Sequence, residues 1–351
     1  MRSENHPLRI RSIIRACGIL FAGVISWQAV TAQSRTVSPA ADSWGKAASL
    51  LEAVGEQAVA QLDGKIYLIG GKLEGKGYVA TVQVYDVATD TWEWATPLPV
   101  AINHNVAVAV NGKIYSIGGQ TPTPKAGGAP TDVTFEYDPS TQQWRTRAPL
   151  PSRRTAGAIA VVNDKIYVVG GRTPPHGEAD YDDFTVYDPA TDTWTRLPHL
   201  PTRRHHLNAV AIDGKIYVAG GTLIVGAGGY SDGGGTTNVL EIFDPATNTW
   251  SQGQPMPTAR EAASGIVANG CFHIFAGEVP DADVLLAHEV YNPATNTWAK
   301  MPDRMPIPVN GISGSGGGFE NGIIYLPGGT TTPGGKQIDV LQTYRPTQTC
   351  R

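Results

Sequence analysis

Three arginines recur at equivalent places in this 351-residue sequence, each ten residues before a segment of the type GKIYxxGG: Arg154, Arg204 and Arg260. A guanidinium group matches a carboxylate through two parallel hydrogen bonds, so arginines at one rim of a cavity are suited to binding a small anion such as a sugar acid. The alternative is structural, with each arginine bridging to a neighbouring repeat. Both interpretations depend on the repeats placing these side chains at similar heights.

Further ionisable side chains share this register. Glu56, His104 and His206 lie eight residues before copies of the same segment, and Glu278 directly follows the glycine pair of the fifth copy. Glutamate and histidine are common general acids and bases near neutral pH. We therefore expect these four residues to line one ligand-binding cavity with the arginines, with Glu278 as the catalytic candidate. For the histidines, the alternative is an imidazole buried against a backbone carbonyl.

Metal and cofactor chemistry receives little support. No histidine or cysteine spacing typical of a metal site is present, and we expect neither a metal nor a cofactor. The segment from Arg172 to Phe184 contains acidic side chains whose oxygens could bind calcium, but we interpret it as a solvated acidic loop. The glycine-rich segment 226–235 lacks the lysine and helix of a phosphate-binding loop, which favours a flexible insertion.

The elements that position these residues are set by an internal repeat of about fifty residues. The six copies, spaced 48, 52, 50, 56 and 52 residues apart, begin at Gly64, Gly112, Asp164, Gly214, Gly270 and Gly322. An alternating segment ending in Tyr-Asp-Pro or a variant follows each of the first five glycine pairs, then a polar turn and a tryptophan. Each repeat thus contains four predicted strands, which is typical of a propeller blade.

Ring closure is predicted from the two ends of the repeat array. The sixth repeat has three strands, ending at Tyr344, and no tryptophan follows it. Residues 42–50 align without a gap on residues 90–98, so Trp44 belongs to a fourth strand that is separated from its repeat. We expect this N-terminal strand to complete the last blade, because closure removes the free sheet edges. The predicted fold is an all-β propeller of six blades, with four strands per blade.

The glycine pairs and the spaced tyrosine and tryptophan of residues 40–349 resemble those of kelch-repeat β-propellers. That family includes protein-interaction modules, the copper enzyme galactose oxidase, iron-dependent plant specifier proteins and an exported bacterial enzyme that interconverts sialic-acid anomers. Glu278 resembles a glutamate at the same place in the last of these. The copper site of galactose oxidase needs a cysteine cross-linked to a tyrosine, whereas Cys271 begins a strand at the opposite face.

The N-terminal residues resemble a signal peptide. A basic segment precedes an uncharged, mostly apolar run from Ala16 to Trp27, and small residues precede Gln33. We predict a signal peptide at residues 1–32, a linker at 33–41 and the propeller at 42–349, with export to the periplasm or beyond. The alternative is an uncleaved membrane anchor. The short apolar run argues against it, since a membrane-spanning helix takes about 20 apolar residues. No membrane span is expected in the mature chain.

The sequence features are compatible with two functions. The first is an exported module that binds a ligand, a glycan or a protein through its channel-face loops; the second is an enzyme acting on a sugar acid. A net charge of −4 without a basic run argues against nucleic acid. An oxidising compartment would permit a disulfide between Cys271 and Cys350, but the sequence gives no distance between them.

Overall fold

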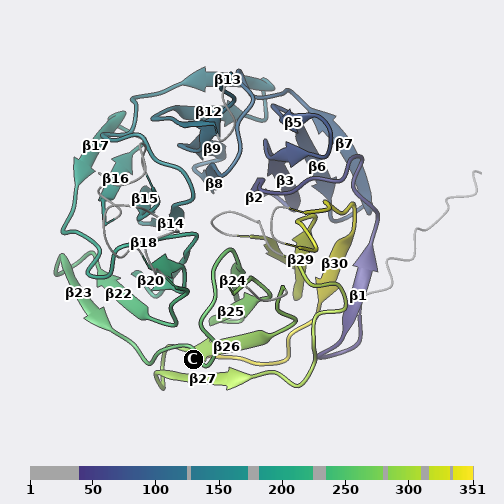
Figure 1. Cartoon of the computed structure of the whole chain (residues 1–351), viewed down its shortest axis with the longest axis vertical. Helices are drawn as coiled ribbons and strands as arrows, with labels where there is room; N and C mark the ends of the chain where they lie inside the picture. The colour runs from purple at the N-terminus through teal and green to yellow at the C-terminus, as the bar shows by residue number, and fades with distance from the viewer. Residues whose placement is uncertain are drawn as a thin grey trace, which may run out of the picture. The chain divides into compact units, whose positions relative to one another are not determined.

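Each repeat folds into one four-stranded antiparallel sheet, and six such sheets form a closed ring (Figure 1). The computed structural model describes residues 39–124, 128–172, 182–223, 235–279, 284–309, 316–332 and 335–350. The predicted signal peptide at 1–32 lies outside these residues, as do most of the acidic segment after Arg172 and most of the glycine-rich segment 226–235. The described residues all belong to one compact unit, Thr36–Arg351.

The first three blades run from their innermost to their outermost strand in chain order. They consist of β2 (Ala58–Leu62), β3 (Lys65–Ile69), β6 (Val82–Asp86) and β7 (Thr91–Ala95); β8 (Val106–Val110), β9 (Lys113–Ile117), β12 (Thr134–Asp138) and β13 (Gln143–Thr146); and β14 (Ala158–Val162), β15 (Lys165–Val169), β16 (Phe184–Asp188) and β17 (Thr193–Arg196). This order follows the four strands predicted from the sequence.

The remaining blades repeat the arrangement. They consist of β19 (Asn208–Ile212), β20 (Lys215–Ala219), β22 (Leu240–Asp244) and β23 (Thr249–Gln252); β24 (Ser264–Ala268), β25 (Cys271–Phe275), β26 (His288–Asn292) and β27 (Thr297–Lys300); and β28 (Gly318–Glu320), β29 (Ile323–Pro327), β30 (Leu341–Tyr344) and β1 (Trp44–Ala47). Three short two-stranded sheets accompany the blades: β4 (Lys72–Leu73) with β5 (Gly77–Tyr78), β10 (Gln120–Thr121) with β11 (Ala129–Pro130), and β18 (Arg204–His205) with β21 (Thr222–Leu223).

The predicted closure of the ring is confirmed. Strand β1 pairs antiparallel with β30, with Trp44 opposite Tyr344, so the N-terminal strand supplies the outer edge of the sixth blade. Trp44 also packs against Phe275 of the fifth blade, with ring centroids 5.6 Å apart. A disulfide between Cys271 and Cys350 attaches the C-terminal segment to the start of β25. That bond settles the pairing that the sequence left open.

The recurrent tyrosine and tryptophan hold neighbouring blades together. The Trp92 indole donates a hydrogen bond to the Ala48 carbonyl of the preceding blade, and Asp90 accepts bonds from the Ala48 N–H and the Tyr85 hydroxyl. The same contacts recur for Tyr187, Asp192 and Trp194 with Ala148. Asp90 and Asp192 have positive φ, which Asp and Asn tolerate better than other side chains. In these two blades the polar turn before the tryptophan therefore also joins the blade to the preceding one.

The glycine pairs permit close packing between blades. A Cβ on Gly70, which has φ +68°, would lie 2.5 Å from the carbonyl oxygen of Ile102 in the next blade. Ala276 stands where the other pairs have their first glycine, and its φ of 54° resembles the 62–68° of Gly70, Gly118 and Gly170. The fifth blade thus keeps the turn despite the added methyl group.

The centre of the ring is an apolar channel. A cavity of about 290 Å³ lies among the innermost strands, lined mainly by small and branched side chains that include Val108, Ile159, Val210 and Ile266.

The residues that the structure describes contain no helix long and apolar enough to cross a membrane.

Candidate functional site at the channel face

The loops entering the innermost strands and the loops leaving the glycine pairs meet at one face. Five residues from the first set pair, blade by blade, with the residue directly after each glycine pair: Gly55 with Lys72, Asn103 with Gln120, Thr155 with Arg172, His205 with Thr222, and Glu261 with Glu278. We call this face the channel face. The pairing confirms that the two sequence registers lie together.

A ring of backbone hydrogen bonds runs around the channel face. The His104 N–H donates to the Glu56 carbonyl at 3.0 Å, the Ala156 N–H to the His104 carbonyl at 3.0 Å, and the His206 N–H to the Ala156 carbonyl at 2.8 Å. Ala262 continues the ring to the His206 carbonyl. All five residues have positive φ, between 49° and 57°. Consecutive blades are therefore linked through the residues that the sequence placed eight positions before each repeat segment.

The ring brings three of the predicted site residues together. His104 Nδ1 lies 3.6 Å from Glu56 Oε2, and the His104 and His206 rings meet edge to face with centroids 5.1 Å apart. Asn103 donates a hydrogen bond to the same Glu56 oxygen at 2.5 Å. Glu56, His104 and His206, which the sequence predicts to line one ligand-binding cavity, therefore lie beside one another.

His205 and Glu261 extend this group, although the sequence analysis assigned no role to Glu261. His206 Nδ1 lies 3.4 Å from Glu261 Oε2 and 2.5 Å from His205 Nδ1. Glu278 exchanges two backbone hydrogen bonds with Glu261 and so lies beside the same group. The signal for Glu261 was available, since it occupies the register of His205 one repeat later. We call Glu56, His104, His205, His206 and Glu261 the channel-face cluster.

Burial sets the electrostatics of the channel-face cluster. It lowers the pKa of His104 to about 4, opposed by the nearby Glu56 carboxylate, and it also lowers the pKa of His206 well below the ordinary range. The positive charge of Arg172 acts in the same direction as burial on both rings. Neutral imidazoles can accept as well as donate hydrogen bonds. Among the described residues, His104 Nδ1, Asn103 Oδ1 and Thr222 Oγ1 are buried without a hydrogen-bond partner.

The three arginines predicted to bind an anion are engaged elsewhere. Arg204 is fully buried, and its guanidinium group is paired with Glu241 and donates to the Val218 carbonyl at 3.1 Å. Arg260 lies 2.8 Å from Glu289 and donates to the Ala276 carbonyl. Each carboxylate belongs to the arginine's own blade. These contacts favour a structural role for the arginines, but their side chains act within one blade and do not form the bridge to a neighbouring repeat that the alternative specified.

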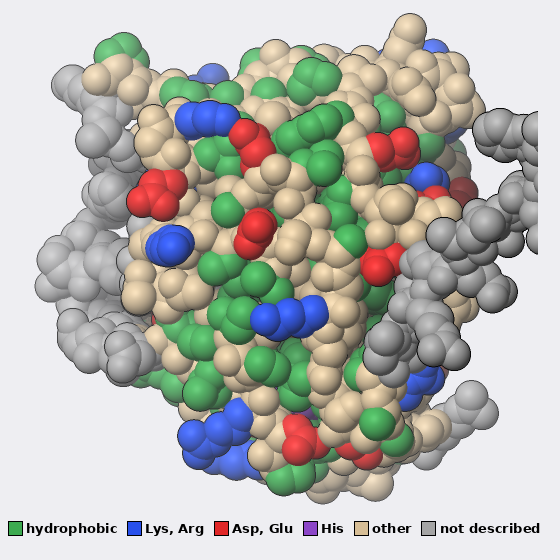
Figure 2. Space-filling model, turned by 90° about the vertical axis from the view of Figure 1, so that its right-hand side faces the viewer, with side chains coloured by type: hydrophobic (Ala, Val, Ile, Leu, Met, Phe, Trp, Pro, Cys, Tyr) green, Lys and Arg blue, Asp and Glu red, His purple; other side chains and the backbone are tan. Residues whose placement is uncertain are grey.

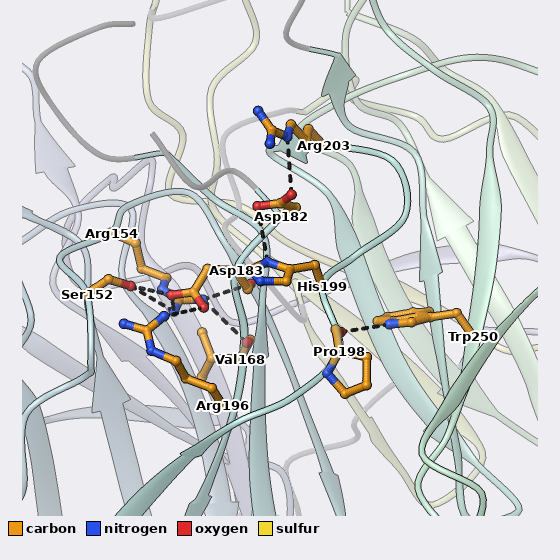
Figure 3. Close-up of polar contacts among 10 residues, drawn as sticks. All are labelled: Ser152, Arg154, Val168, Asp182, Asp183, Arg196, Pro198, His199, Arg203 and Trp250. Atoms are coloured by element: carbon orange, nitrogen blue, oxygen red, sulfur yellow. Dashed lines mark hydrogen bonds and ion pairs between the residues drawn. The ribbon is translucent and has the colours of Figure 1, made fainter. Parts of the chain in front are cut away.

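Arg154 follows the same plan in the third blade (Figure 3). Its guanidinium group is paired with Asp183, donates to the Val168 carbonyl, and shares Asp183 with Arg196. The bridge to the neighbouring blade, which the structural alternative required, comes from the backbone: the Arg154 carbonyl accepts the Gly119 N–H at 2.9 Å. A buried arginine with a matched carboxylate has little capacity left for a ligand's carboxylate.

Comparisons with known proteins agree with this architecture. The KLHDC2/KLHL20/DRC7 Kelch-repeats domain matches residues 45–221, and the Kelch motif matches residues 203–257. A solved structure titled "Structure of YjhT" superposes with a TM-score of 0.68 at 14% identity, covering 84% of this chain and 95% of that one. At that identity the likeness concerns the fold alone.

The fold, a closed ring of six four-stranded blades, defines the molecule as a six-bladed β-propeller. With half of its length matched by a kelch domain, the chain belongs to the kelch-repeat family.

Proposed function

We propose that this propeller is a binding module for a small polyhydroxylated ligand, a sugar or sugar acid, held at the channel face. The observation that carries the proposal is the convergence of carboxylates and neutral imidazoles at the ring of backbone hydrogen bonds, with unpartnered polar atoms among them. Carboxylates accept hydrogen bonds from hydroxyl groups, and imidazoles can donate or accept them. Buried polar atoms without partners are rare in native proteins and mark places where water or a ligand binds.

A small polar ligand suits the channel face better than an apolar protein partner. Among the described residues, the large hydrophobic side chains that stand exposed are Leu51, Trp94 and Val100. Contiguous apolar surface is what marks many protein interfaces. On the side of the ring seen in Figure 2, basic and acidic side chains are interspersed among hydrophobic and uncharged ones, so that side presents no field of a single sign.

Charged groups near the channel-face cluster support a place for a ligand carboxylate. Lys72 and Arg172 both disfavour protonation of His104, which requires their positive charges to lie within electrostatic reach of it. They pair through their backbones with Gly55 and Thr155 at the same face. Arg172 and Lys72 therefore replace the buried arginines as the cations proposed to attract an acidic sugar.

The proposed setting is outside the cytoplasm. The disulfide between Cys271 and Cys350 supports this proposal, because such bonds persist in oxidising compartments. The predicted signal peptide, cleaved after Ala32, would deliver the protein there. Intact-mass analysis of the exported protein is expected to place the N-terminus at Gln33, and a mass that retains Met1 would contradict cleavage.

Calorimetric titration and thermal shift of the mature chain with neutral sugars and sugar acids test the binding function. Ligand binding to the native state raises its stability, by about 2.7 kcal/mol at a ligand concentration of one hundred times Kd. Glu56→Gln should weaken binding of the selected sugar at least tenfold, because it removes a charged hydrogen-bond acceptor. The matched control is Glu52→Gln, since Glu52 is paired with the exposed Lys76 nearby.

The result that would overturn the binding function is the absence of stabilisation by every sugar and sugar acid. Equal losses in Glu56→Gln and Glu52→Gln would also overturn the assigned site. The enzyme alternative is favoured by one observation, the pairing of Glu278 with Glu261 beside His206, which gathers several proton-transfer groups. Nuclear magnetic resonance of the bound sugar acid, followed for a change in anomer or epimer ratio, separates catalysis from simple binding.

A further inference from the structure

We infer that His205, His206 and Glu261 form a binding site for one divalent transition-metal ion at the channel face. Nδ1 of His205, Nδ1 of His206 and a carboxylate oxygen of Glu261 all lie within 4.8 Å of one another. The three residues come from two consecutive blades, the fourth and the fifth. Two imidazole nitrogens and one carboxylate oxygen are a donor set that suits Zn²⁺ and neighbouring first-row metals.

The local chain explains why two consecutive histidines face one point. In a strand, neighbouring side chains alternate between opposite faces. His205 ends the short strand β18, but His206 has φ 52°, and this left-handed residue breaks the alternation. Its conformation is held by two hydrogen bonds of the backbone ring, to the Ala156 carbonyl and from the Ala262 N–H. The convergence of the imidazoles is thus built into the backbone.

One of the two printed separations between donor atoms matches what a metal requires. A tetrahedral ion with ligands at about 2.0–2.1 Å sets neighbouring donor atoms about 3.3 Å apart. Glu261 Oε2 and His206 Nδ1 are 3.4 Å apart. The two Nδ1 atoms are 2.5 Å apart, closer than two ligands of one ion. Metal binding therefore requires these two nitrogens to separate by about 0.8 Å, and His206, the less buried of the two histidines, is the ring that would move.

Burial favours a specific site over adventitious surface binding. His205 and Glu261 are 3% and 2% exposed, so their orientations are fixed by packing. Three protein ligands leave at least one position of a tetrahedral ion for water or a ligand group. The ring of His104 packs against His206 on the other side and can orient it.

The fold supplies a matched control for the metal site. His199 Nδ1 lies 3.4 Å from Asp182 Oδ1, the same separation as His206 and Glu261 (Figure 3). That carboxylate is shared with Arg203, and His199 is largely exposed. The control pair thus offers a single imidazole, and the Asp182 carboxylate is already paired with Arg203.

The experiment is a Zn²⁺ titration of tag-free mature protein, freed of metal with a chelator and followed by competition with a chromophoric chelator, without any sugar. We expect one equivalent to bind, and Co²⁺ in its place should give the visible absorption of a tetrahedral complex. Glu261→Gln, which keeps the side-chain shape, and His206→Asn, which suits a left-handed residue, should each weaken Zn²⁺ binding by at least tenfold. His199→Asn should leave it unchanged.

Three results would overturn the metal site. The first is the absence of stoichiometric Zn²⁺ binding by the wild type. The second is unchanged affinity in folded Glu261→Gln, which remains informative even if His206→Asn fails to fold. The third is an equal loss in His199→Asn. Stoichiometric Zn²⁺ binding in a protein that binds no sugar would support the metal site and overturn the proposed function.

Discussion

Two regions of the propeller bury ionisable side chains, and they do so in different ways. In the arginine pairs, Arg204 and Arg260 each meet a carboxylate from a strand of their own blade and donate to nearby carbonyls. In the channel-face cluster, His205 and His206 of the fourth blade converge on Glu261 of the fifth. The arginine pairs are closed by matched charges, whereas the cluster gathers several acceptors with no matching cation among its members.

The difference between the two regions lies in charge: each buried arginine is matched by a carboxylate of its own blade, whereas the histidines of the channel-face cluster are uncharged when buried. From the sequence, three arginines at one rim were the strongest indication of an anion site. An unpaired buried guanidinium group would destabilise the fold, and each arginine is paired with a carboxylate of its own blade. The histidines are neutral when buried and carry no such requirement, so they can be arranged around a ligand or a metal ion.

The largest expected effect tests the arginine pairs. Arg204→Ala should lower the free energy of unfolding by about 3–5 kcal/mol, because it leaves the Glu241 carboxylate buried and unpaired. The neighbouring Arg203→Ala is the control; Arg203 is exposed beside Asp182, and its loss should cost less than about 1 kcal/mol. Urea unfolding measures both. If Arg204→Ala is as stable as Arg203→Ala, the arginine does not have the structural role assigned to it.

A second prediction uses a histidine pair that has no carboxylate at hydrogen-bond distance among its described contacts. His273 Nδ1 lies 3.0 Å from His288 Nε2, and both rings stack on Phe275. Burial lowers the pKa of His273 to about 4 and of His288 to about 2, against an ordinary value of 6.5. Arg260 adds to the effect on His288, and Asp42 opposes it on His273.

The sign of the pH dependence follows from these shifts. Below pH 6.5 the unfolded chain takes up protons that the native histidines refuse, so stability present above pH 6.5 is lost as the pH falls towards 4. His288→Gln should reduce this dependence by up to about 1.4 kcal/mol per pH unit. The measurement is urea unfolding at pH 7, 6 and 5, with His199→Gln as the exposed control. A slope unchanged from the wild type in His288→Gln would show that the core pair is already protonated in the native state.

A third prediction concerns the stability of the channel-face cluster, where a small effect is expected. His206→Asn should change the free energy of unfolding by less than about 1 kcal/mol, because Asn adopts positive φ readily and the backbone ring is retained. Thermal unfolding of the chelated protein measures the change. A loss comparable to that of Arg204→Ala would mean that the channel-face cluster, like the arginine pairs, serves mainly to hold the fold.

Much of the architecture was predicted from local sequence. The repeated glycine pairs set the left-handed turns, and the spaced Tyr, Asp and Trp supply the interblade lock. The unpaired strand around Trp44 indicated ring closure. These features recur around the ring, with Ala276 in place of one glycine, and each depends on residues within one repeat and its neighbour. The register of Glu56, His104 and His206 was also readable, since residues at equivalent positions must lie at similar heights in a ring.

What only the tertiary structure decided was the direction and partner of each buried side chain. Arg204 and His206 are two positions apart, yet the first turns to Glu241 of its own blade and the second to Glu261 of the next one. The disulfide joins residues 79 positions apart, and no local pattern specified that distance. Repeats determine where the backbone lies because their signals are local. Partners depend on neighbouring blades and distant chain ends, which become neighbours only when the ring closes.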